Sequence, residues 1–141
     1  MSRTWLQIIN GLLAILTLAL GASSMAFGAK SPIYASAEIP SLPVLDSNLR
    51  FFGGMGVGLA LALLWILPTI EQRTVIFRVI WLAAFIGGLG RILSFFLVGS
   101  PPLPLLVFTV LEVPAVPLLL YWQSQVAKAK RSAVFQPKQP L

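Results

Sequence analysis

Residues 51–70 read FFGGMGVGLALALLWILPTI and contain no charged side chain. A helix rises about 1.5 Å per residue, so about twenty residues cross the hydrocarbon core of a bilayer, which is ~30 Å thick. Helical structure is expected because a segment in lipid must satisfy its backbone N–H and C=O groups internally. The stretch therefore predicts a membrane-spanning helix over about 50–70.

Three other stretches have the same length and apolar character. The chain of 141 residues is 57% hydrophobic and 10% charged, whereas a soluble domain carries about 25% charged residues. Four helices are therefore expected, over about 5–27, 50–70, 74–98 and 103–123. The predicted fold class is an all-α integral membrane four-helix bundle, formed by residues 1–123 and followed by a basic cytoplasmic tail at 124–141.

The segment 28–49 differs from the spans because it contains Pro32, Pro40 and Pro43. Proline interrupts the hydrogen bonds of a helix interior, so we expect an irregular outer loop between helices 1 and 2. The polar cluster at residues 46–48, Asp-Ser-Asn, is typical of a helix N-cap. It predicts that the second helix begins close to that cluster.

Lysine and arginine fall mainly on one side of the predicted bundle. With the N-terminus inside, the outer side holds only two of them, Lys30 and Arg50, and the cytoplasmic side holds seven. The seven are Arg3, Arg73, Arg78, Lys128, Lys130, Arg131 and Lys138. Because cytoplasmic loops of membrane proteins carry an excess of positive residues, both termini are predicted to be cytoplasmic (N-in/C-in).

The first span allows a second interpretation, as a cleavable signal peptide. Arg3 precedes an apolar run, and residues 35–37, Ala-Ser-Ala, have the small-residue spacing of a cleavage site. The apolar run is longer than that of a normal signal peptide, and the Ala-Ser-Ala motif lies well beyond its end. A retained first helix is therefore favoured.

One charge of each sign lies well inside the predicted spans: Arg91 in the third helix and Glu112 in the fourth. A charge at mid-membrane costs about 2.5 kcal/mol or more, so each should face the bundle interior beside a partner. Both lie about 10 to 14 Å from the outer ends of antiparallel neighbouring helices. We therefore expect a buried ion pair, with Ser94 nearby. It either fixes helix register or forms a candidate site for a ligand or a proton.

Glycines crowd the second and third predicted helices. Small residues let helix backbones approach closely in a membrane, so these positions are predicted to form packing faces. They are Gly53, Gly54, Gly58, Gly87, Gly88 and Gly90. A phosphate-binding loop is the alternative, but neither the G-x-G-x-x-G spacing nor a preceding strand is found.

Asp46 and Arg50 lie four residues apart at the outer mouth of the second helix. This spacing favours a local ion pair on a helix surface. The alternative is an anion contact in which Arg50 receives a negatively charged group, such as a lipid headgroup, above the bundle.

The residue types that are missing exclude several chemistries. The chain contains no Cys and no His. Disulfides, iron–sulfur clusters, thiolate nucleophiles and imidazole bases are therefore excluded, and no metal site is predicted. No catalytic constellation is found, so an enzyme is not expected. The net charge of +6 follows from the topology, and nucleic-acid binding is not expected.

A set of short motifs over residues 46–123 resembles one bacterial family. The motifs are Asp46, Arg50-Phe51-Phe52-Gly53-Gly54, Ile70-Glu71, Phe77-Arg78, Gly87-Gly88-Leu89-Gly90-Arg91 with Ser94, Gly99-Ser100-Pro101, and Glu112 with Pro114. Together they resemble the domain-of-unknown-function 4345 family, which comprises small four-helix membrane proteins related to the DoxX-like group. The resemblance implies a four-helix membrane bundle and supplies no catalytic residues.

The DoxX-like resemblance also bears on cofactors. Some DoxX-like relatives are associated with quinone-linked sulfur oxidation. Because this chain lacks Cys and His, redox chemistry here would need a bound quinone or a partner's cofactor. No cofactor is predicted, and a bound lipid or quinone remains open.

Three functions are consistent with these observations. The leading hypothesis is an uncharacterised, non-enzymatic multi-pass membrane protein that binds a lipid-like ligand or a partner subunit. The alternative is a small oligomeric proton- or cation-coupled transporter using Glu112, and the third is a membrane enzyme acting on a lipid or quinone. The expected partners are membrane lipids, a second copy of the chain or a membrane subunit. The expected location is the bacterial cytoplasmic (inner) membrane, with a thylakoid-type membrane as the alternative.

Overall fold

The computed structural model describes residues 2–35, 37, 39–40, 42–101 and 103–135. Within these residues the chain is helical and has no strand. The long helices are α1 (Arg3–Phe27), α2 (Pro43–Ile66), α3 (Thr74–Val98) and α4 (Leu103–Phe135), and short 3-10 turns lie at Gly28–Lys30, Pro32–Tyr34 and Leu67–Thr69. All four long helices are long and apolar enough to cross a membrane. The predicted all-α fold with four candidate spans is therefore confirmed.

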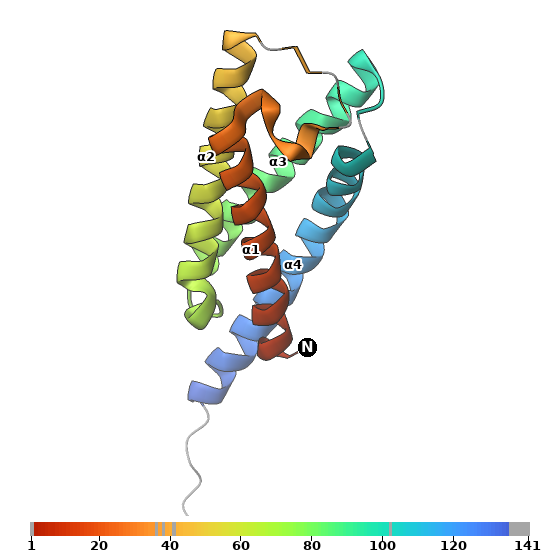
Figure 1. The fold of residues 1–141 in the computed structure, drawn as a ribbon. Coiled ribbons are helices and arrows are strands. Elements are labelled where there is room, and N and C mark those ends of the chain that lie inside the picture. Colours follow the sequence, from red (N-terminus) through yellow and green to blue (C-terminus); the bar gives the residue numbers. More distant parts are fainter. Residues whose placement is uncertain (1, 36, 38, 41, 102, 136–141) are drawn as a thin grey trace, which may run out of the picture.

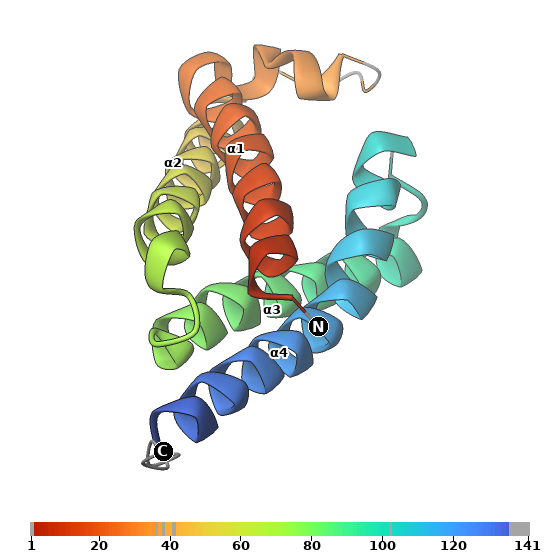
Figure 2. The ribbon, with the colours of Figure 1, turned by 90° about the horizontal axis from the view of Figure 1, so that it is seen from below.

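The helices form two hairpins, α1–α2 and α3–α4, that meet mainly at one end of the molecule (Figures 1 and 2). We call this the terminal end, because it holds the start of α1, the α2–α3 turn at 67–73 and the last turns of α4. The opposite end, with segments 28–42 and 99–101, is the loop end. The buried core lies toward the terminal end, around Leu6, Ile66, Phe77, Val116 and Val126.

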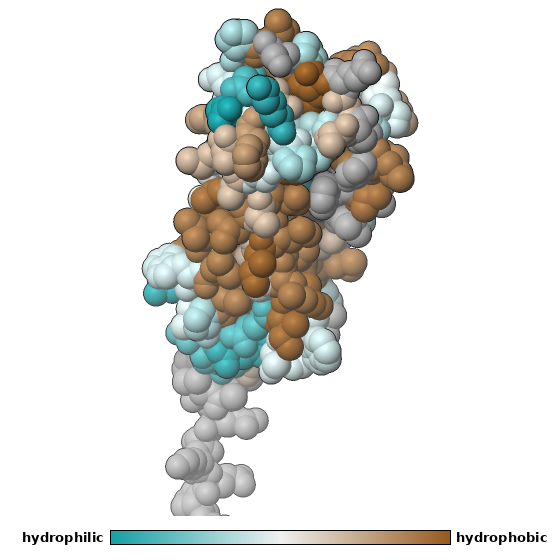
Figure 3. Space-filling model, in the orientation of Figure 1, coloured by the Kyte–Doolittle hydropathy of each residue, from teal (hydrophilic) through white to brown (hydrophobic). Residues whose placement is uncertain are grey.

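The surface between the two ends is apolar. Figure 3 shows a broad hydrophobic belt with hydrophilic residues gathered above and below it. Large apolar side chains such as Leu12 and Leu93 are more than half exposed. A soluble protein would bury such side chains, so this surface fits contact with lipid chains.

Helix α2 begins at Pro43, earlier than predicted. The N-cap residue is Leu42, and Asp46 lies in the first turn of the helix. The predicted N-cap at residues 46–48 is therefore wrong. The φ angle of proline suits a helix, and the backbone N–H that proline lacks would have no partner at the first helical position. Pro43 therefore starts this helix instead of preventing it. The loop before α2 is also less irregular than expected, because it contains two 3-10 turns.

Helix α4 continues through Phe135, so its predicted end at 123 is wrong. Residues 124–135 contain neither proline nor glycine. Val126 and Ala127 are buried at the terminal end of the bundle, so the apolar face of the helix continues beyond residue 123. Residues 124–135 of the predicted tail are thus helical, and Lys138 lies outside the described residues.

Candidate functional site

The two charges predicted to pair inside the spans are in contact. The Arg91 guanidinium, on α3, donates from Nη1 to Oε2 of Glu112, on α4, over 3.0 Å. Arg91 lies seven residues before the last residue of α3, Val98. At about 1.5 Å per residue, this places it about 10 Å inside the loop-end limit of the helix.

Gly88 allows α4 to approach α3 beside this pair. A Cβ atom at Gly88 would lie 2.8 Å from Cγ2 of Val113 and 3.6 Å from Cβ of Glu112. A larger residue would therefore require the Val113 side chain on α4 to shift. Gly88 precedes Arg91 by three residues, so both face α4 from neighbouring turns of α3.

The pair is not buried, contrary to the prediction. The Arg91 side chain is 43% exposed and the Glu112 side chain is 30% exposed. The physical reason is that the hairpins diverge toward the loop end (Figures 1 and 2), where every residue from Leu93 to Ser100 is exposed. Ser94 is among them, and no hydrogen bond between described residues joins it to either charge.

The predicted glycine faces divide into two groups. Gly53 and Gly88 lie at close helix contacts, and a Cβ at Gly53 would come within 2.7 Å of the backbone oxygen of Gly21 on α1. Gly21 was not identified from the sequence.

The remaining glycines do not support the packing prediction. A Cβ at Gly54 would make only an ordinary contact, 3.8 Å from Met25 Sδ, and at Gly58, Gly87 and Gly90 it would meet nothing within 4 Å. The predicted Gly54–Gly58 packing face is wrong because α1 approaches the neighbouring face of α2, through Gly53.

Asp46 and Arg50 form the expected pair at the loop end, and they do more than pair. Arg50 Nε donates to Asp46 Oδ2 over 2.7 Å, and Arg50 Nη1 donates to the carbonyl oxygens of Met25 and Ala26. The other Asp46 oxygen accepts from the backbone N–H of Ala29 over 2.9 Å. The pair therefore ties the C-terminal end of α1 to the first turns of α2.

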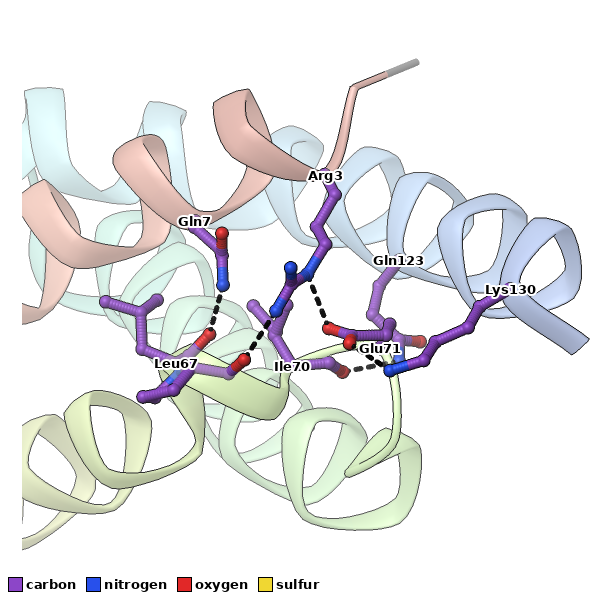
Figure 4. A network of polar contacts seen from close by, with 8 residues as sticks. Arg3, Gln7, Leu67, Ile70, Glu71, Gln123 and Lys130 are labelled. Carbon is purple, nitrogen blue, oxygen red and sulfur yellow. Dashed lines mark hydrogen bonds and ion pairs between the residues drawn. The ribbon is translucent and has the colours of Figure 1, made fainter. Parts of the chain in front are cut away.

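A polar network that centres on Glu71 lies at the terminal end, and its contacts were not predicted from the sequence (Figure 4). The Glu71 side chain, in the α2–α3 turn, is 1% exposed. It accepts from Arg3 Nε of α1 over 3.0 Å and from Lys130 Nζ of α4 over 2.7 Å. The Glu71 carboxylate, in the α2–α3 turn, thus links α1 of the first hairpin to α4 of the second.

The charge state of Glu71 follows from these contacts. Burial raises the pKa of the carboxyl, but hydrogen bonds from Lys130, from its own backbone and from Arg3 outweigh burial and lower the pKa to about 2. Glu71 is therefore ionised throughout the physiological pH range.

Neutral side chains complete the terminal end. Gln7 donates to the carbonyl of Leu67 over 2.9 Å, and Gln123 donates to the carbonyl of Ile70 over 3.0 Å. Deeper in the bundle, Trp81 Nε1 donates to Oδ1 of the fully buried Asn10 over 3.0 Å. These polar residues interrupt otherwise apolar helices, and that interruption was the only signal of their roles in the sequence.

Comparison with known protein families identifies the family of the chain. The family described as Domain of unknown function (DUF4345) matches residues 5–123, and the chain belongs to this family. The match includes α1, for which the sequence offered no sharp motif. A search of curated proteins and a search of solved structures each found no match. The relation to the DoxX-like group stays a prediction.

Proposed function

We propose that this member of the DUF4345 family is a non-enzymatic membrane protein that binds a lipid-like ligand or a partner subunit through the α3–α4 hairpin. The observation that carries the proposal is the Arg91–Glu112 pair, which is partly exposed inside two candidate spans. Charged groups in a membrane normally face protein or water, because exposure to hydrocarbon is costly.

A bound group with polar atoms would relieve this cost. A hydroxyl or carbonyl oxygen of a lipid-like molecule, or a polar side chain of a partner helix, could accept from Arg91. A hydroxyl group could also donate to Glu112. The apolar remainder would then lie along the exposed positions 93–98 of α3. This division into a few polar contacts and a large apolar surface is typical of sites for amphiphilic ligands.

Native mass spectrometry from mild detergent tests the proposal. The wild-type protein is expected to retain a lipid-like molecule or a second protein chain. The double variant Arg91→Leu/Glu112→Leu, which strands neither charge, is expected to lose it while keeping its helical circular dichroism. The control Lys128→Gln/Arg131→Gln removes two exposed charges at the terminal end and should keep the bound species. Equal retention by both variants would contradict the proposal.

A second candidate, a proton- or cation-coupled transporter, is favoured by one feature. Glu112 is the acidic residue furthest from the ends of the described spans. Its pairing with Arg91 argues against this role, because a neutralised carboxylate binds a further cation weakly. Uptake of protons or cations by proteoliposomes that is abolished by Glu112→Gln would favour the transporter. A third candidate is a membrane enzyme acting on a lipid or quinone, and chemical conversion of a retained molecule would favour it.

The orientation is part of the proposal. We assign the terminal end to the cytoplasmic side of a bacterial inner membrane, because this end carries most of the lysine and arginine residues. Because the chain has no native cysteine, labelling with a membrane-impermeant maleimide can test this assignment. A cysteine replacing the exposed Ala35 should react in intact spheroplasts, and one replacing the exposed Gln72 should react only after lysis. The opposite pattern would reverse the topology.

A further inference from the structure

A groove of about 300 Å³ opens at the loop end, between the end of α1 and the start of α2. Both cationic and apolar residues line it. The lining includes Phe27, Lys30, Leu42, Pro43, Asp46 and Arg50. It lies on the α1–α2 hairpin, so it is separate from the Arg91–Glu112 site of the proposed function.

The charges of the groove favour an anion. Both oxygens of Asp46 are already engaged, by Arg50 and by the Ala29 N–H. The groove lining therefore holds two cations, Lys30 and Arg50, for one carboxylate, Asp46. Lys30 is exposed and forms no ion pair with any described residue. The start of α2 adds to the positive potential, because its N-cap residue Leu42 supplies no side-chain hydrogen bond to the helix amides.

The groove lies at the depth of a lipid headgroup. From Gln7 to Phe27 helix α1 extends over about 30 Å, which is the thickness of the hydrocarbon core. Lys30 follows this limit directly, and Arg50 reaches the carbonyls of Met25 and Ala26 in the last turn of α1. Phe27 and Leu42, which are both more than half exposed, present apolar surface beside these cations.

We propose that this groove binds the phosphate headgroup of an anionic membrane lipid. Lys30 and Arg50 contact the phosphate, and Phe27 and Leu42 contact the glycerol and the first carbons of the acyl chains. Lys30 supplies the charge that distinguishes an anionic lipid from a zwitterionic one, because Arg50 is shared with Asp46. Arg50 also holds the end of α1, so Lys30 is the residue to change.

A local fluorescence measurement tests the site in a bilayer. Bimane is attached to a cysteine replacing Val44, which adjoins the groove, or to one replacing Val75 at the terminal end. The two positions are matched, with exposed fractions of 76% and 75%. Each protein is reconstituted in phosphatidylcholine vesicles containing nitroxide-labelled phosphatidylglycerol or nitroxide-labelled phosphatidylcholine, and quenching is followed as labelled lipid increases.

The proposal expects labelled phosphatidylglycerol to quench the Val44 probe at lower mole fractions than labelled phosphatidylcholine. Lys30→Gln should weaken this preference about fivefold, which is the contribution of one cation at a lipid surface. Lys128→Gln, a matched change at the other end, should leave the preference at Val44 intact. The Val75 probe should be insensitive to Lys30→Gln.

Three results would overturn the proposal. The first is equal quenching by both lipids at Val44, and the second is a preference that survives Lys30→Gln. The third is loss of the preference when inorganic phosphate is added at constant ionic strength, which would identify a soluble oxyanion as the ligand instead of a lipid. None of these results bears on the α3–α4 site.

Discussion

The two hairpins are alike in length and apolar character, but they differ in how their helices meet. In α1–α2 the backbones approach at Gly21 and Gly53, and the contact extends along both helices. In α3–α4 the contact is less extensive, and Gly88 supports it beside a partly exposed ion pair. The closely packed hairpin fits a scaffold, and the more open one fits a surface that contacts something else in the membrane.

The two acidic residues Glu71 and Glu112 show the same contrast. Glu71 is nearly fully buried and has two cationic partners, whereas Glu112 has one partner and is partly exposed. The Glu71 carboxylate is 1% exposed and both of its oxygens are engaged, so it is closed to a ligand. Glu71 is therefore architectural, and Glu112 belongs to the candidate site.

The largest effect is expected from Gly53→Leu in the scaffold hairpin. The new side chain would collide with the backbone of α1 at Gly21, which cannot move without separating the helices. We expect a loss of about 3 kcal/mol or more in the free energy of unfolding, measured by titration with a denaturing detergent. The control is Gly58→Leu on the same helix, where an added Cβ meets nothing. Similar losses in both variants would show that the α1–α2 contact is not at Gly53.

The next effect is expected at the connection between the hairpins, Glu71. The pKa of Glu71 is lowered from 4.5 to about 2 by folding, so its contribution to stability is present above pH 4.5. This contribution, about 3 kcal/mol as an upper value, is lost as pH falls from about 4.5 to 2. Thermal unfolding of the wild type should therefore shift to lower temperature in this window. Glu71→Gln should be less stable at pH 7 and should respond less to acid, and a parallel pH response would contradict the assignment.

A smaller effect is expected at the Arg91–Glu112 pair. Replacing one partner by leucine leaves the other charge without its counter-ion, so each single variant should lose about 2 kcal/mol in a bilayer. The double variant should be more stable than either single variant, because no charge is stranded. A double variant as unstable as the sum of the single losses would mean that the two residues do not interact.

Local patterns in the sequence predicted most of the fold. Apolar runs of about twenty residues identified four spans. Matching depth in neighbouring helices predicted the contact of Arg91 with Glu112, and the four-residue spacing predicted that of Arg50 with Asp46. These predictions needed only the depth of a residue in its helix or the distance between neighbouring turns. They did not depend on how the two hairpins cross.

The sequence could not predict what depends on that crossing. The exposure of Arg91 results from the divergence of the hairpins, and no periodicity in α3 indicates it. The role of Glu71 required residues 3 and 130 to reach the same turn, although they are far apart in the chain. Gly53 and Gly54 are neighbours of the same type, and only the position of α1 distinguishes them.

The smallest effect is expected from Gly88→Leu, which tests how open the second hairpin is. A Cβ at Gly88 would meet the end of the Val113 side chain at 2.8 Å, and a side chain can shift where a backbone cannot. We therefore expect a loss of about 1 kcal/mol, well below that of Gly53→Leu. The matched control is Gly87→Leu, one residue away, where nothing lies within 4 Å. A loss at Gly88 as large as that at Gly53 would mean that α3 and α4 form a packed scaffold too. A loss at Gly87 in the bilayer but not in detergent would instead mean that another chain or a lipid packs against this face, which would sharpen the contrast between the hairpins.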